Sequence, residues 1–148
     1  MVGGQMLDIL AEKRAEEGAE PLSVQETEKL QSGKTGALIR FAASAGPILA
    51  EASGGDQAAL DAYGARIGLA FQIRDDLLDL EGDEAETGKK LRKDATAGKA
   101  TFVDLLGGDG ARSRAQELVE AAKSALSSFG DSATLMRQAA DFTDERLR

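Results

Sequence analysis

Long runs of helix-forming residues, interrupted by glycines, are the feature of this sequence that most restricts its fold. Ala, Leu, Glu, Gln, Lys and Arg dominate between the breaks, and the only prolines are Pro21 and Pro47. These residue types have high helix propensity. β-branched residues are scattered singly, so no segment shows the apolar–polar alternation of a half-buried strand. The sequence therefore predicts an all-α fold.

Apolar periodicity and capping residues predict about six helices in one domain of 148 residues. Ser23, with Glu26 three residues later, has the pattern of a capping box, and Asp56 is the expected N-cap of a long third helix. The expected helices span roughly residues 4–17, 23–49, 56–82, 102–106, 111–129 and 133–147.

Several glycines fall inside these expected helices, where each costs about 1 kcal/mol relative to alanine. Such glycines predict close contact between helices or close approach of the backbone to a ligand. They are Gly33, Gly36, Gly64 and Gly68.

The chain contains neither cysteine nor histidine. Disulfides, thiolate metal sites and Ser-His or Cys-His nucleophile systems are therefore excluded. Any metal held by this chain should be a hard cation bound by oxygen, such as magnesium or calcium.

The charge and hydropathy of the chain exclude two further classes of partner. The net charge of −8 argues against nucleic-acid binding, which depends on clustered Lys and Arg. No apolar run approaches the about 20 residues of a membrane span. The first residues lack the basic and apolar regions of a signal peptide. We therefore expect a cytoplasmic protein.

Three aspartates near the end of the third expected helix form the sharpest candidate site. Asp79 lies four residues after Asp75 and three after Asp76, so the three carboxylates crowd one helix face and repel one another. The helix macrodipole also disfavours negative charge in these last turns. Magnesium, held by carboxylates together with substrate phosphates, would offset both effects. The alternative is an acidic, solvated helix end, but neighbours such as Phe71 and Leu77 place the acids against a core-facing surface.

Two weaker patterns supply groups suited to a phosphate ligand, and a third places an amide and a carboxylate on one helix face. A lysine and a hydroxyl beside glycines can approach a phosphate closely. Taken singly, each pattern also has an ordinary explanation as surface or solvated loop. The residues are Lys34 with Thr35, Lys89 and Lys99 in the charged loop at 81–99, and Gln5 with Asp8 on one face of the first helix.

Taken together and in this order, these patterns resemble the trans-isoprenyl diphosphate synthases, which include the farnesyl and geranylgeranyl diphosphate synthases. The resemblance covers essentially the whole chain, and the Lys-Thr-Gly-Ala-Leu-Ile string is similar to the bacterial short-chain branch. The matching strings are Gly3-Gly4-Gln5-x-x-Asp8, Lys34-Thr35-Gly36-Ala37-Leu38-Ile39, Gly68-Leu69-Ala70-Phe71-Gln72-x-x-Asp75-Asp76-x-x-Asp79, Gly82-Asp83, Gly88-Lys89, Asp94 and Gly98-Lys99-Ala100-Thr101.

The resemblance implies a prenyltransferase that condenses an allylic diphosphate with isopentenyl diphosphate, with Mg²⁺ as cofactor. It implies Asp75 as a direct magnesium ligand, with Asp76 and Asp79 completing the site partly through water. The catalytic residues that it implies are Lys34, Thr35, Gln72 and Lys89. The substrate-binding residues that it implies are Gln5, Asp8, Lys34, Gln72, Lys89 and Lys99.

The family's first aspartate-rich motif and its isopentenyl-binding basic residues lie upstream of the Gly-Gly-Gln string, where this chain begins. We therefore expect residues 1–148 to be the carboxyl-terminal part of a polyprenyl synthetase domain. Such a fragment would form the second half of the isoprenoid synthase bundle. It would supply the second aspartate-rich motif and be inactive alone.

Apolar stripes such as Leu60–Ile67–Phe71 and Leu38–Phe41 would then face water, and exposed patches of this kind drive association. We expect a homodimer, or association with the missing amino-terminal half. Two other functions stay open. One is a magnesium-dependent diphosphate-binding or regulatory subunit without catalysis of its own, and the other is an unrelated helical bundle whose acids are surface charge.

Overall fold

The computed structural model describes residues 1–81 and 101–145, and the regular secondary structure of this part of the chain is entirely helical, without a strand. The finding confirms the all-α fold class and the expected number of helices. Lys89 and Lys99 lie outside the described residues. The α-helices are α1 (Val2–Glu16), α2 (Val24–Ser32), α3 (Thr35–Leu49), α4 (Gly54–Glu81), α7 (Phe102–Ala125) and α8 (Thr134–Glu145), and the 3₁₀ helix η1 (Ser127–Ala133) precedes α8.

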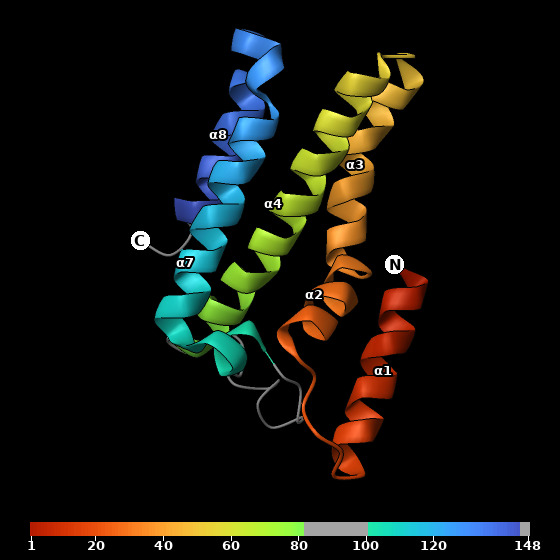
Figure 1. Cartoon of the computed structure of the whole chain (residues 1–148), viewed down its shortest axis with the longest axis vertical. Coiled ribbons are helices and arrows are strands. Elements are labelled where there is room, and N and C mark those ends of the chain that lie inside the picture. Colours follow the sequence, from red (N-terminus) through yellow and green to blue (C-terminus); the bar gives the residue numbers. More distant parts are fainter. Residues whose placement is uncertain (82–100, 146–148) are drawn as a thin grey trace.

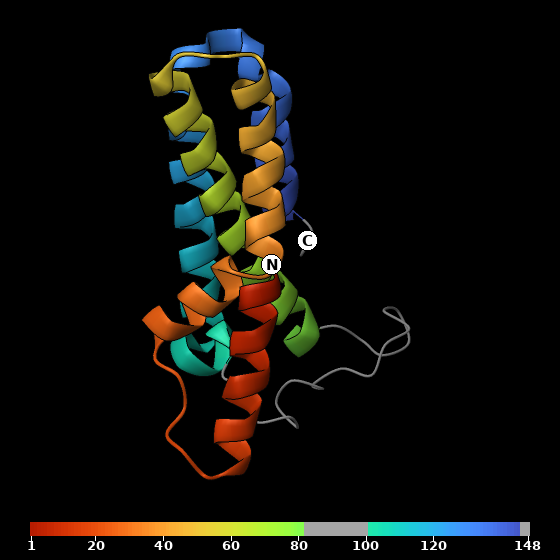
Figure 2. The ribbon, with the colours of Figure 1, turned by 90° about the vertical axis from the view of Figure 1, so that its right-hand side faces the viewer.

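Helix α4 is the centre of the bundle, with α3 packed on one side and α7 on the other (Figure 1). Helix α8 packs against α7 and α4, whereas α1 packs against α2 and extends away from the base of α3 (Figure 2). The buried core lies mainly between α4 and α7. Its fully buried members on these two helices are Ala70, Ile73, Leu77, Phe102, Ala111, Ala115 and Ala122. None of the helices that the structure describes is long and apolar enough to cross a membrane.

The expected single helix over residues 23–49 is wrong, because the structure divides it. Helix α2 ends at Ser32 and α3 begins at Thr35. At the break, Gly4 of α1 lies directly against Gly33, and a Cβ on Gly4 would be 2.2 Å from the Gly33 carbonyl carbon. The interruption thus coincides with the crossing of α1, a tertiary contact that local helix propensity does not reveal.

The helix starts were predicted with mixed success. The capping box of Ser23 and Glu26 is present at the start of α2. At the start of α4, the N-cap is Ser53 rather than Asp56, because the Ser53 Oγ accepts a hydrogen bond from the Asp56 N–H at 3.1 Å. The acid at the third helical position is the usual partner of such a cap, so the prediction was displaced by three residues.

The two helices expected at 102–106 and 111–129 form one element, α7, with a break inside it. Gly107 has φ 71° and ψ 164°, outside helical geometry, so the expected glycine turn is present as a kink. Glycine takes this positive φ without the steric cost that a side chain would bring.

Close helix contact explains the interior glycines of α3 and α4. A Cβ on Gly68 would lie 2.8 Å from the Gly36 Cα, and one on Gly64 would lie 2.9 Å from the Arg40 Cα. Beside this contact, Arg40 donates two hydrogen bonds of 2.7 Å to Asp61. These bonds hold the pKa of the Asp61 carboxyl below its ordinary value. The antiparallel register of α3 and α4 is therefore set by backbone contact and by this ion pair.

The expected exposed stripes are only half correct. Leu38 and Phe41 of α3 are 49% and 70% exposed. Ile67 instead lies buried in the core, and Leu60 and Phe71 are partly buried. Ile67 belongs to the core cluster shared by α4 and α7, so this part of α4 is covered within the chain.

The glycine contact predicts the effect of added methyl groups. Gly68→Ala should lower the free energy of unfolding by about 1–3 kcal/mol, because the new Cβ would meet the α3 backbone. Gly3→Ala is the matched control: Gly3 lies in α1, and no atom from outside its own stretch of helix comes within 4 Å of its Cβ position. That change should raise the free energy by about 0.5–1 kcal/mol. Urea denaturation measures both, and a neutral Gly68→Ala would contradict the contact.

Candidate functional site

The candidate site lies on the face of α4 that contacts α3, in the part of α4 that extends past the start of α3. Gly64 and Gly68 contact α3. Residues four, seven and eleven positions after Gly68 fall on the same helix face, and these are Gln72, Asp75 and Asp79. We call these three residues the polar face. Helix α3 begins at the level of Gly68, so it does not cover the polar face.

The three predicted metal ligands differ in their surroundings. Asp75 is exposed, Asp79 is half-buried and Asp76 is 9% exposed. Asp76 points toward α7: its Oδ2 accepts a hydrogen bond of 3.0 Å from the Phe102 N–H, and its Oδ1 accepts one of 3.2 Å from the Gln72 side-chain amide. Within residues 1–81 and 101–145, no three acidic side chains are grouped so as to hold a metal ion. The three-carboxylate magnesium site stays a prediction.

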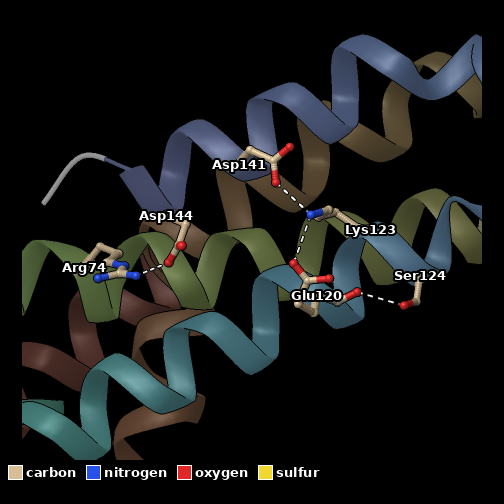
Figure 3. Close-up of polar contacts among 6 residues, drawn as sticks. All are labelled: Arg74, Glu120, Lys123, Ser124, Asp141 and Asp144. Atoms are coloured by element: carbon tan, nitrogen blue, oxygen red, sulfur yellow. Dashed lines mark hydrogen bonds and ion pairs between the residues drawn. The ribbon is translucent and has the colours of Figure 1, made fainter. Parts of the chain in front are cut away.

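Helix α8 contacts a different side of α4 from the polar face. The buried Arg74 forms an ion pair with Asp144, near the end of α8, and Lys123 of α7 pairs with Asp141 of α8 at 2.8 Å (Figure 3). Successive helical residues point about 100° apart. With Arg74 directed at α8, the adjacent Asp75 is directed to the surface.

Lys34 and Asp8, both predicted to contact substrate, are brought together from separate helices. The Lys34 ammonium lies 2.6 Å from the Asp8 Oδ2, and the Asp8 side chain is only 6% exposed. The buried Asp8 carboxylate holds the Lys34 ammonium in place. The ammonium has three N–H donors, so two remain for other acceptors. Of the other predicted residues in this region, Gln5 is exposed on α1 and Thr35 is half-buried at the start of α3.

The register of α3 and α4 determines where Lys34 lies relative to the polar face. Because the two helices are antiparallel, the step from Gly36 back to Lys34 runs in the same direction as the step from Gly68 toward Gln72. Gln72 is four residues, or about 6 Å along the axis, beyond Gly68. The fold therefore places the Lys34 ammonium at the start of α3, and the polar face of α4 lies further along the same direction.

The residue types of the polar face fit a magnesium ion. Mg²⁺ takes oxygen ligands, keeps several waters, and is commonly held by one or two carboxylates together with substrate phosphates. The exposed Asp75 and the half-buried Asp79, one helical turn apart, offer such a pair of carboxylates.

Sequence reasoning missed the contact between Asp76 and the start of α7. One signal for it was available, because Thr101 and Asp104 form a capping box that marks where α7 begins. The sequence contains no signal that the first N–H of that helix would meet a side chain of α4.

The Asp8–Lys34 pair predicts a stability coupling. Lys34→Met should lower the free energy of unfolding by about 2 kcal/mol, because the buried Asp8 carboxylate loses its ammonium partner. Asp8→Asn in the Lys34→Met background should recover at least about 1 kcal/mol of this loss. A double-mutant cycle in urea measures the coupling, and strictly additive effects would show that the pair contributes nothing.

A comparison with known protein families gives one match that covers most of the chain: the family model described as Polyprenyl synthetase matches residues 1–138. Among curated proteins, the chain is 40% identical over 123 residues to the farnesyl diphosphate synthase of Bacillus subtilis, covering 83% of this chain and 40% of that protein.

Solved structures show the same likeness. A crystal structure of a FPP/GFPP synthase from Zymomonas mobilis matches with a TM-score of 0.79 and 42% identity, covering 97% of this chain and 45% of that one. A geranyltransferase from Helicobacter pylori, solved in complex with magnesium and isoprenyl diphosphate, matches with a TM-score of 0.75 and 29% identity, covering 99% of this chain and 46% of that one. The chain thus spans less than half the length of these relatives.

Proposed function

This chain belongs to the polyprenyl synthetase family, and we propose that it provides the second aspartate-rich, magnesium–diphosphate site of a prenyltransferase that condenses an allylic diphosphate with isopentenyl diphosphate. One observation carries the proposal. The polar face of α4 begins near the start of α3, where Asp8 holds the Lys34 ammonium, and continues along α4 from there. The geranyltransferase from Helicobacter pylori was solved with magnesium and isoprenyl diphosphate bound, and this complex supports the same ligand class here.

Each group of the site has a physical task in this proposal. Asp75 and Asp79 would hold magnesium, which, when bound, helps neutralise the negative charge of the departing diphosphate. Lys34, held by Asp8, directs a fixed positive charge at the diphosphate, and preorganised charges of this kind stabilise developing negative charge. Gln72, next to Asp75 on the polar face, would lie near the allylic group attached to that diphosphate. Lys89 and Lys99 remain proposed diphosphate contacts outside the described residues, and Gln5 and Thr35 remain proposed pocket residues.

A diphosphate-binding or regulatory subunit without turnover of its own is the second candidate. The observation that favours it is that the 148 residues hold one Asp-Asp-x-x-Asp motif, which could bind a magnesium–diphosphate group without turnover. Both candidates require the same magnesium–diphosphate site, and they differ in turnover.

Binding of magnesium with inorganic pyrophosphate should stabilise the folded chain. At ligand concentrations 100-fold above the dissociation constant, the melting temperature should rise by about 5–10 °C. Asp75→Ala should abolish the rise, and Asp131→Ala should leave it intact, because Asp131 is exposed in η1 at the opposite end of the bundle (Figure 1). Differential scanning fluorimetry measures the rise. An undiminished rise in Asp75→Ala would remove this carboxylate from the site.

The 148-residue chain alone should yield no prenyl product from dimethylallyl diphosphate, isopentenyl diphosphate and magnesium. Removing even one preorganised stabiliser of developing charge typically costs about 10²–10³ in rate, and one aspartate cluster anchors only part of the metal complement. Labelled isopentenyl diphosphate and extraction of the products provide the assay. Activity that appears when the amino-terminal half of a full-length relative is added would support the proposal. Farnesyl product from this chain alone, lost in Asp75→Ala, would refute the expectation of inactivity.

A further inference from the structure

We propose that Asp76 is a positioning residue, which ties the end of α4 to the start of α7, and that the magnesium-binding oxygens come from its neighbours on α4. The inference rests on the proposed function, since it separates one carboxylate of the aspartate-rich motif from the metal task.

Both oxygens of Asp76 are engaged inside the contact between α4 and α7. The Oδ2 accepts the Phe102 N–H at 3.0 Å and the Oδ1 accepts the Gln72 amide at 3.2 Å. Asp76 is 9% exposed and Phe102 is fully buried. A carboxylate so far removed from water requires hydrogen-bond partners of this kind to remain charged.

The start of α7 needs a group like Asp76. The first N–H groups of a helix have no partner within the helix. In α7, the capping box of Thr101 and Asp104 satisfies the N–H groups of those two residues. The Phe102 N–H is bonded by Asp76 instead. A carboxylate in this place also interacts favourably with the positive end of the helix macrodipole.

The geometry of α4 separates Asp76 from the polar face. Asp76 is one residue after Asp75 and therefore points about 100° away from it around the helix. Asp75 is exposed, whereas Asp76 faces α7. Because Mg²⁺ keeps several waters in an octahedral shell, it suits an open carboxylate better than an oxygen enclosed between two helices.

An asparagine at position 76 distinguishes positioning from metal ligation. Its carbonyl oxygen can still accept the Phe102 N–H, and its NH₂ group can donate to Gln72 after that side chain turns its amide around. Asparagine therefore preserves the hydrogen bonds to Phe102 and Gln72 and removes the charge, whereas alanine removes both the hydrogen bonds and the charge.

The experiment compares Asp76→Asn, Asp76→Ala and Asp75→Asn by melting temperature, first without ligand and then with magnesium and inorganic pyrophosphate. Without ligand, Asp76→Ala should melt at least about 5 °C below the parent chain, because the Phe102 N–H stays buried and unpaired. Asp76→Asn should melt at a temperature closer to that of the parent than to that of Asp76→Ala, since it keeps both hydrogen bonds and loses only the charge. With ligand, Asp76→Asn should keep most of the stabilisation, and Asp75→Asn should lose it.

Two results would overturn the inference. One is an Asp76→Ala chain that melts like the parent, which would show that the tie to α7 contributes nothing. The other is an Asp76→Asn chain that melts like the parent without ligand but loses the ligand shift as Asp75→Asn does, which would make Asp76 a direct metal ligand. If Asp75→Asn keeps the shift, the proposed function fails, and the ligand-free melting temperatures still decide the role of Asp76.

Discussion

The backbone contact between Gly36 and Gly68 determines where every candidate group on α3 and α4 lies. With a Cβ position on Gly68 only 2.8 Å from the Gly36 Cα, no larger residue fits unless the helices move apart. The Arg40–Asp61 ion pair adds a polar constraint on the same register. Since α3 begins just before this contact, α4 continues past it and α3 does not cover the polar face. The location of the site is therefore a consequence of close helix packing.

Helix α4 is restrained on three sides, and these restraints decide which aspartates reach the surface. Glycines hold it to α3, Arg74 binds Asp144 of α8, and Asp76 binds the first N–H of α7. The rotation of α4 about its axis follows from these contacts. Asp75 is thereby left exposed while Asp76, the next residue, is enclosed.

The same arrangement resolves an electrostatic conflict within the aspartate-rich motif. Three carboxylates at the carboxyl end of one helix repel one another and oppose its macrodipole. The amino end of α7 offsets this cost for Asp76. In the proposed function, magnesium offsets it for Asp75 and Asp79. The asymmetry between adjacent aspartates in one motif thus follows from the helix packed beside one of them.

The sequence by itself determined the helical class, the approximate helix boundaries and the family resemblance, because helix propensity, caps and motif strings are local properties. It also indicated that Gly36, Gly64 and Gly68 mark close contacts, since interior glycines carry a local cost. Only the tertiary structure decided that the helix breaks at Gly33 and that Asp76, rather than Asp75, is enclosed. Those outcomes depend on α1 and α7, which lie tens of residues away in the chain. Local sequence patterns do not show which distant backbone group, such as the Phe102 N–H, will need a hydrogen-bond partner.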